Sequence, residues 1–238
     1  MAEHGRLDIC AAEWSMKHGE LTREKKAQAV GGSNMSDSAV FKITYAVGMI
    51  SMFMIRIAYR LRGRSLRWKA DPRFRSLEML LLAFAVIGAL VVPLVYVFSN
   101  VLSFADYQLP TWAGWAGALV WLGALWMLWR SHSDLGRNWS QTLALRNGHE
   151  LITHGVYRRV RHPMYAALWV WGIAQAMLLH NWVAGFSQLL SFAPLYFLRV
   201  PREERMMLDY FGDKYRTYMS HTGRVLPRWS PSPPWMTL

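Results

Sequence analysis

The sequence predicts an all-α, polytopic membrane protein of about five transmembrane helices, because two of its properties point the same way. Hydrophobic residues make up 53% of the 238 residues, and they gather in long blocks instead of being spread along the chain. The net charge is +12, and the basic residues concentrate in the segments that follow alternate blocks. The only cysteine is Cys10, so the chain predicts no internal disulfide and no Cys-x-x-Cys metal site.

Five apolar segments account for the predicted spans. A bilayer core needs roughly 20 apolar residues in a helix, and the second and third segments meet that length with one acid and with no charge. The first segment is weaker, because Lys42 and Arg56 lie near its ends, where they could snorkel to the membrane surface. The last two segments are shorter and form a hairpin with His180 and Asn181 at its tip. In chain order the segments are Ala39–Tyr59, Leu77–Phe98, Thr111–Trp129, Ala166–Leu179 and Trp182–Leu198.

The distribution of Lys and Arg predicts the orientation in the membrane. Basic residues follow the first, third and fifth segments, whereas the loop SNVLSFADYQLP and the hairpin tip contain none. The positive-inside rule therefore places the N-terminus outside, and the basic loops and the C-terminus in the cytoplasm. A basic chain can also bind nucleic acid, but basic residues confined to loops favour membrane orientation and no nucleic-acid partner. We expect a multi-pass protein of the cell inner membrane.

The same pattern divides the chain into four parts. We expect a flexible polar extension (1–38), three spans with a basic loop (39–135), a polar loop with the hairpin and a C-terminal helix (136–229), and a tail (230–238). The C-terminal helix is predicted to be amphipathic and to be interrupted at Gly212. Its apolar stripe consists of Met206, Met207, Tyr210, Phe211 and Tyr215.

The stretch GVYRRVRHPMY, Gly155–Tyr165, places three arginines and a His-Pro pair directly before an apolar segment. Pro163 lacks an N–H and fits the first turn of a helix, and it disfavours helical angles at His162. We predict a helix that begins at Pro163 and whose free N–H groups favour an anionic group such as a carboxylate. The alternative is an interfacial anchor, with Arg161 and His162 at the membrane surface and Tyr165 in the aromatic belt.

The stretch LRVPREER follows the fifth segment. Arg199 and Glu203 are four residues apart, so they share a face if the helix continues through Pro201. A carboxylate pair with arginines at the end of a span is costly to leave unpaired, so a polar site is one interpretation of this stretch. The alternative is that Glu203 and Glu204 are solvated and only balance nearby arginines. His149 and Glu150 lack further His or Cys at metal-ligand spacing, so no metal is expected.

Taken in order, these motifs resemble the isoprenylcysteine carboxyl methyltransferase family, which includes phospholipid methyltransferases. The resemblance rests on GVYRRVRHPMY, the hairpin, the Glu203–Glu204 pair and FGDKYRTYMSHTGRVLP, within Gln141 to Pro227. It implies a membrane enzyme that uses S-adenosylmethionine, bound by the C-terminal region at the cytoplasmic face. It also implies catalytic roles for Arg199, facing the acceptor, and for Glu203. The implied cofactor contacts are Gln141, His149, Glu150, Leu151, Ile152, Tyr157, His162, Pro163, Met164, Tyr165 and Glu203.

The acceptor is less well defined than the cofactor. The resemblance implies a lipophilic small molecule or a lipidated substrate, and we expect the carboxylate of an isoprenylcysteine-like group; a lipid amine or a small thiol are alternatives. Two other classes of protein stay open. Membrane sterol-type reductases that use NADPH share an RHPxY-like block but are longer. A non-enzymatic scaffold would use the basic loops to bind anionic membrane lipids.

Overall fold

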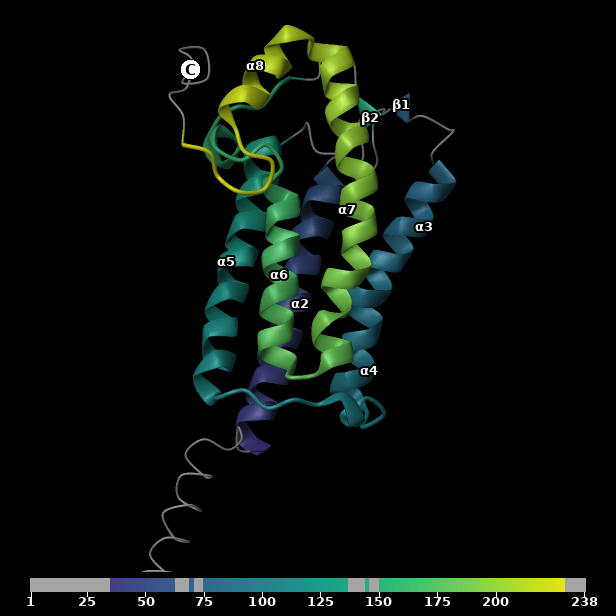
Figure 1. Cartoon of the computed structure of the whole chain (residues 1–238), viewed down its shortest axis with the longest axis vertical. Helices are drawn as coiled ribbons and strands as arrows, with labels where there is room; N and C mark the ends of the chain where they lie inside the picture. The colour runs from purple at the N-terminus through teal and green to yellow at the C-terminus, as the bar shows by residue number, and fades with distance from the viewer. Residues whose placement is uncertain (1–34, 63–68, 71–74, 137–143, 146–149, 230–238) are drawn as a thin grey trace, which may run out of the picture.

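A computed structural model describes residues 35–62, 69–70, 75–136, 144–145 and 150–229. Helices run side by side along the long axis of the molecule (Figure 1). The two strands of the described part, β1 (Lys69–Ala70) and β2 (Ala144–Leu145), are two residues long each and pair antiparallel. The prediction of an all-α fold is therefore confirmed. The predicted site residues Gln141 and His149 lie outside the described ranges.

Four helical segments are long and apolar enough to cross a membrane: Asp37–Leu61, Ser76–Phe98, Thr111–Leu135 and Trp182–Phe211. A fifth apolar helix, Pro163–Leu179, has 17 residues and is shorter than the others. Each of these segments overlaps one of the five predicted spans, and the protein is an integral, multi-pass membrane protein. The helices are α2 (Met35–Arg62), α3 (Arg75–Val86), the π-helical η2 (Ile87–Val91), α4 (Val92–Phe98), α5 (Thr111–Leu135), α6 (Pro163–Leu179), α7 (Trp182–Phe211) and α8 (Asp213–His221).

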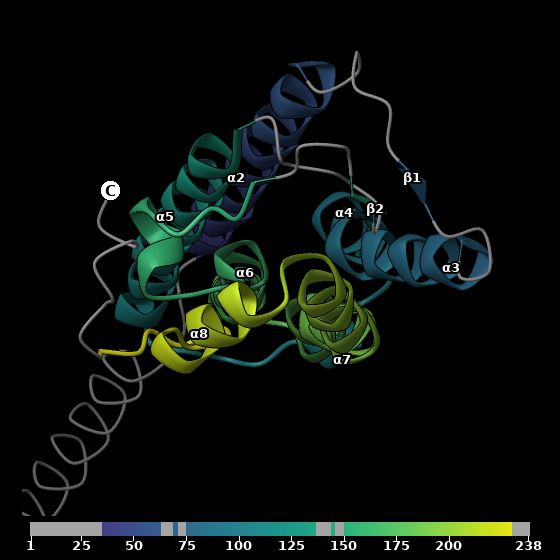
Figure 2. The same cartoon turned by 90° about the horizontal axis from the view of Figure 1, so that it is seen from above.

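Helix α6 lies at the centre of the bundle. It packs between α5 and α7 and also contacts α2, while α3 and α4 cover the outer side of α7 (Figure 2). Close approach depends on glycines of α5: a Cβ at Gly114 would meet the Phe41 ring at 2.3 Å, and one at Gly117 would meet Met177 at 2.7 Å. Helix packing buries both glycines.

The second span is not a continuous α-helix. It changes to π-helix over Ile87–Val91, which ends two residues before Pro93. Pro93 has no N–H to offer the carbonyl of Ala89, one turn earlier. The hydroxyl of Tyr45 in α2 lies 2.9 Å from this carbonyl oxygen and donates to it. Since no water reaches the hydrocarbon core, a neighbouring helix has to satisfy the carbonyl that Pro93 leaves exposed.

Gln175 of α6 extends this polar contact through the bundle. Its Oε1 lies 3.0 Å from the Tyr45 hydroxyl, and its Nε2 donates to the carbonyl of Ala184 at 2.7 Å. The hydroxyl of Ser187 donates to the carbonyl of Gly88 at 2.6 Å. Gln175 is fully buried; its Nε2 has a partner, and its Oε1 shares the single proton of the Tyr45 hydroxyl with the Ala89 carbonyl. The network therefore joins α2, η2, α6 and α7.

The hairpin tip lies at the end of the bundle away from the basic loops. His180 adopts a left-handed conformation, with φ 46°, and Asn181 caps α7 through its side-chain oxygen. The amide nitrogen of Asn181 donates to the carbonyl of Leu102 and to Asp106, both at 2.7 Å. The predicted turn at these two residues is confirmed. It packs against the loop after the second span, which likewise contains no Lys or Arg.

Helix α7 continues through Pro194 and Pro201 and ends at Phe211, followed by Gly212 with φ 57°. The prediction that the helix is interrupted at Gly212 is confirmed, whereas the predicted end of the fifth span at Leu198 leaves out the last 13 residues of α7. Thirty helical residues span roughly 45 Å, more than a hydrocarbon core of roughly 30 Å. One end of α7 therefore has to extend beyond the core.

Candidate functional site

Three segments meet at the end of the bundle where α6 begins: the segment before α6, the C-terminal part of α7 and the chain after α8 (Figure 1). The chain after α8 turns back and lies beside the segment that precedes α6, in parallel. The N–H of Arg161 donates to the carbonyl of Gly223 at 2.9 Å, and that of His162 donates to Arg224 at 3.0 Å. Gly223 donates in turn to Arg159 at 3.0 Å. The RHPMY motif and the GRVLP motif are thus neighbours in space, although about 60 residues separate them in the sequence.

Glu204 is the centre of this meeting point. Its side chain is 6% exposed, and Oε1 accepts hydrogen bonds from Arg161 Nε at 2.7 Å and from Arg224 Nε at 3.1 Å. Arg224 Nη2 donates to Oε2 at 2.6 Å, and His162 Nε2 lies 3.3 Å from Oε1. The hydrogen bonds to Glu204 raise the pKa of Arg224 above its ordinary value. The interpretation of Glu204 as a solvated charge is wrong, because three basic side chains surround it.

Glu203 lies on the other side of the His162 ring. Its Oε2 accepts a hydrogen bond of 2.7 Å from the hydroxyl of Tyr165, and its Oε1 is 4.0 Å from His162 Nδ1. The rings of His162 and Tyr165 are 5.6 Å apart. Glu203 is 31% exposed, whereas Glu204 is 6% exposed. The structure therefore brings together three of the predicted site residues and leaves one carboxylate, that of Glu203, accessible.

Arg199 lies one turn before Glu203 on the continuous helix α7. Its Nη1 is 2.9 Å from Oε1 of Glu78 in α3, and both side chains are 11% exposed. Glu78 is the single acid at the start of the second apolar segment. The structure therefore connects the predicted acceptor residue to the N-terminal half of the chain, which the sequence did not indicate.

The loop before RHPMY is fixed to α5. Gly155 has φ 59°, and a Cβ there would lie 2.1 Å from Oδ2 of Asp134. The same oxygen accepts a 2.9 Å hydrogen bond from the N–H of Val156, and Arg130 pairs with Oδ1 at 2.9 Å. Glycine is required at position 155 both for its positive φ and for this close approach.

Tyr157 is buried between α5 and α8. Its hydroxyl donates to the carbonyl of Ser131 at 3.3 Å, and its own carbonyl accepts a 2.7 Å hydrogen bond from the hydroxyl of Tyr218. Burial raises the pKa of both phenols above the ordinary value, so both hydroxyls stay protonated donors. Tyr157 thus joins α5, the loop before RHPMY and α8.

The remaining predicted residues lie in different surroundings. Pro163 is the first residue of α6, as predicted, and no side chain caps this helix start. Met164 packs against the main hydrophobic core, and Leu151 packs against the Tyr215 and Tyr218 rings. Glu150 is exposed and Ile152 is half-buried.

The sequence did not identify four residues that contact the predicted site residues or Glu204: Glu204 itself, Arg224, Glu78 and Tyr218. Glu204 was visible as half of the EE pair, but adjacent helical residues point in different directions, and the sequence does not say which one turns inward. Arg224 lies next to Gly223 in the GRVLP motif, which could have suggested a turn toward an acid. Glu78 and Tyr218 carry no comparable signal.

The fold and the site define a class of protein: a polytopic membrane protein with a cluster of acids, arginines and one histidine at one end of the bundle. Residues 117–209 match the sequence model of the isoprenylcysteine carboxyl methyltransferase (ICMT) family. The match includes RHPMY and the Glu203–Glu204 pair, so the resemblance that these motifs indicated is confirmed there. The family match ends before FGDKYRTYMSHTGRVLP.

Similar proteins include two named protein-S-isoprenylcysteine O-methyltransferase. The one from Schizosaccharomyces pombe is 31% identical over 94 residues, which are 39% of this chain and 40% of that protein. The one from Homo sapiens is 33% identical over 79 residues, 33% of this chain and 28% of that protein. The matched segments thus cover less than half the length of these relatives. A solved structure of a eukaryotic intramembrane Ras methyltransferase is 23% identical, over 67% of this chain and 53% of the other, with a TM-score of 0.43.

Proposed function

We propose that the protein is an S-adenosylmethionine-dependent membrane methyltransferase whose acceptor is the carboxylate of an isoprenylcysteine-like group. The observation that carries the proposal is the position of the His162 ring between two carboxylates, 3.3 Å from Glu204 and 4.0 Å from Glu203. The family match and the names of the relatives support the reaction class. We propose further that this end of the bundle faces the cytoplasm, in the cell inner membrane, because its loops are basic.

The side chains fit the charges of the cofactor. S-adenosylmethionine supplies the methyl group from a sulfonium cation, and it carries an amino-acid carboxylate and an ammonium group. Glu203 offers an accessible carboxylate to a cationic group. The uncapped start of α6 at Pro163 offers main-chain N–H groups to a carboxylate. Tyr165 orients Glu203 through its 2.7 Å hydrogen bond.

Acid–base chemistry is not required for this acceptor. A carboxylate is already ionised at neutral pH, so the chain has to position it, exclude water from it and align it with the methyl group. Arg199 provides a planar guanidinium that matches a carboxylate through two parallel hydrogen bonds. Its partner in the structure, Glu78, is itself a carboxylate, which supports a carboxylate as the group that Arg199 binds.

A methyl-transfer assay tests the acceptor. The purified full chain would be supplied with labelled S-adenosylmethionine and either N-acetyl-S-farnesyl-cysteine, phosphatidylethanolamine or a small thiol. We expect transfer to the farnesylated cysteine, with a kcat/KM lowered at least about 100-fold in Arg199→Gln, since an ion-paired hydrogen bond contributes about 1.5–3 kcal/mol and a bidentate pair more. Transfer only to the lipid amine or to the thiol would contradict the proposed acceptor.

A further inference from the structure

Arg56 lies within the first candidate span, on the packed face of α2. The exposed stripe of this helix passes through Ile50, Met54 and Ile57. Met52 is 5% exposed, and Arg56, four residues later, shares its face and is half-buried. The structure thus places this arginine toward the bundle, and not on the lipid-facing stripe from which it could snorkel to the surface.

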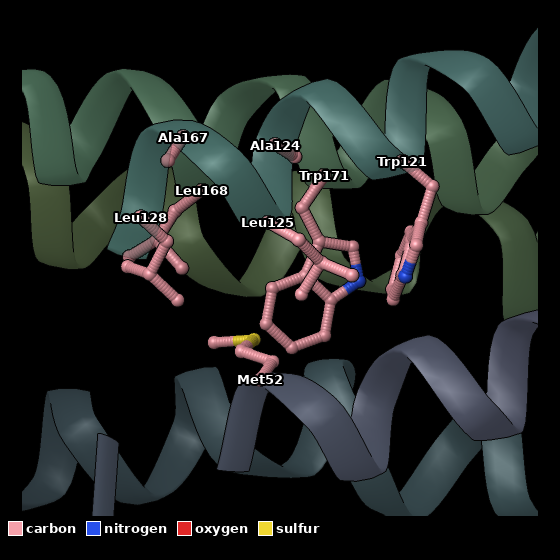
Figure 3. Close-up of a pocket in the computed structure, with 8 residues that line it drawn as sticks. All are labelled: Met52, Trp121, Ala124, Leu125, Leu128, Ala167, Leu168 and Trp171. Carbon is pink, nitrogen blue, oxygen red and sulfur yellow. The ribbon is translucent and has the colours of Figure 1, made fainter. Parts of the chain in front are cut away.

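The surroundings of Met52 show how far along the bundle axis Arg56 lies. Met52, Leu128 and Leu168, from α2, α5 and α6, line an apolar cavity with an empty volume of about 220 Å³, part of it open to the surroundings (Figure 3). One helical turn closer to the candidate site, these helices carry Arg56, His132 and Tyr165 in place of apolar residues. The cavity therefore ends at a polar layer that includes the Tyr165 hydroxyl bound to Glu203.

A contact of a neighbouring residue confirms that Arg56 and His132 lie at the same height in the bundle. The ring of Tyr59, one turn after Arg56, lies 5.2 Å from the ring of His132. Arg199 lies one turn before Glu203, whose carboxylate binds the Tyr165 hydroxyl of this polar layer, and the charge of Arg199 acts on Arg56. Two guanidinium groups from helices far apart in the sequence are thus near each other at the edge of the candidate site.

The two arginines differ in their partners. Arg199 is paired with Glu78 at 2.9 Å. Arg56 makes no hydrogen bond or ion pair with another residue of the described ranges. A guanidinium in a membrane helix is costly without a counter-charge, and a second guanidinium nearby increases that cost. Both costs fall when an anion binds beside the two arginines.

We propose that Arg56 and Arg199 together bind the anionic group of the acceptor, its carboxylate. The inference rests on the proposed function and adds a residue to it from outside the segment that matches the family, residues 117–209. Arg56 determines specificity in this arrangement: it selects an acceptor that ends in a negative charge over a neutral one of the same shape. It does not take part in the transfer itself.

Ligand binding tests this inference without any turnover. Calorimetry on the detergent-purified full chain would compare N-acetyl-S-farnesyl-cysteine with its methyl ester, which has the same tail and no charge. We expect the wild type to bind the carboxylate about 10- to 100-fold more tightly than the ester, the range given by hydrogen bonds to charged groups. Arg56→Gln should lose most of this preference, while Arg56→Lys should keep part of it.

Arg60→Gln is the matched control, because Arg60 lies one turn further along α2 and is exposed. It removes the same charge and should leave the preference unchanged. A preference that survives in Arg56→Gln, or that disappears equally in Arg60→Gln, would overturn the inference. Phosphatidylglycerol that competes equally with both ligands would assign the arginines to a lipid headgroup and would overturn it as well.

The same samples separate this inference from the proposed function. Absence of S-adenosylmethionine binding in a folded wild type that still prefers the carboxylate would refute the methyltransferase and leave the anion site supported. Methyl transfer to the farnesylated cysteine with an unchanged KM in Arg56→Gln would support the enzyme and refute the role of Arg56.

Discussion

Glu78 and Arg199 connect the two halves of the chain, with Oε1 of the acid 2.9 Å from Nη1 of the arginine and both side chains 11% exposed. Helix α3 packs chiefly on α7, so this ion pair lies in its main interface. The pair has two consequences: it holds α3 in place, and it puts a carboxylate where we propose that the acceptor binds.

Glu78→Gln should therefore weaken the fold and strengthen acceptor binding. Loss of a largely buried charged hydrogen bond lowers the free energy of unfolding by about 1–3 kcal/mol. Removal of the competing carboxylate should tighten binding of N-acetyl-S-farnesyl-cysteine several-fold in calorimetry. Asp213→Asn is the control, because Asp213 pairs with Arg216 in an exposed position, 90% and 75% exposed, and should change neither quantity. Weaker acceptor binding in Glu78→Gln would show that Glu78 supports the acceptor site instead of competing for it.

Glu204→Gln should disrupt the end of the bundle. The substitution leaves the buried Arg161 and His162 without the carboxylate that they share, and breaking a buried ion pair costs about 3–5 kcal/mol. Thermal unfolding in detergent measures the loss, and hydrogen exchange should show weaker protection of Arg161 and His162, whose N–H groups bond to Gly223 and Arg224. Glu203→Gln is the matched control, since Glu203 is more exposed and should cost less. An equal fall of the unfolding temperature in the two variants would contradict the role of Glu204 as the main ion-pair partner at this end of the bundle.

Gly155→Ala should displace the loop that carries Tyr157. The new Cβ would lie 2.1 Å from Asp134 Oδ2 at a backbone angle that L-residues rarely adopt, which costs about 1–3 kcal/mol in unfolding free energy. Gly123→Ala in the middle of α5 is the control, because nothing lies within 4 Å of its Cβ, and alanine favours a helix. The account of this loop fails if both substitutions leave the unfolding temperature unchanged.

Tyr45→Phe should destabilise the bundle inside the membrane. It leaves the Ala89 carbonyl, which Pro93 cannot satisfy, without the Tyr45 hydroxyl. Hydrogen bonds between membrane helices contribute about 0.6–1.7 kcal/mol, and we expect a loss in this range from chemical unfolding. Thr44→Val, one position earlier, removes a hydroxyl that bonds to the carbonyl of Val40 in its own helix, and it should have little effect. An equal effect of both substitutions would contradict the interhelical role of Tyr45.

The five spans, the start of α6 and the interruption at Gly212 followed from the sequence because apolar length, Pro163 and Gly212 act locally. The prediction that the fifth span ends at Leu198 failed, because α7 continues through Pro201 to Phe211. The sequence also did not indicate the π-helical segment before Pro93, where the Tyr45 hydroxyl of another helix binds the Ala89 carbonyl. Propensity alone contains no such information.

The candidate site shows the same division. His162, Tyr165 and Glu203 could be named because they lie in two short motifs, and the structure brings them together. The inward turn of Glu204 and the contact of Arg199 with Glu78 depend on how α7 is rotated against α6 and α3, which residue spacing within one helix does not determine. The apolar stripe illustrates this: Met207, Phe211 and Tyr215 cluster, whereas Tyr210 is 46% exposed.

Binding of S-adenosylmethionine to the detergent-purified full chain tests the central claim most directly. Calorimetry should show binding by the wild type, at least about tenfold weaker binding by Glu203→Gln and by His162→Ala, and unchanged binding by Asp213→Asn, since loss of one charged contact corresponds to about 1.5–3 kcal/mol. Absence of binding by a folded wild type, or equal binding by all four proteins, would contradict a cofactor site at His162 and Glu203.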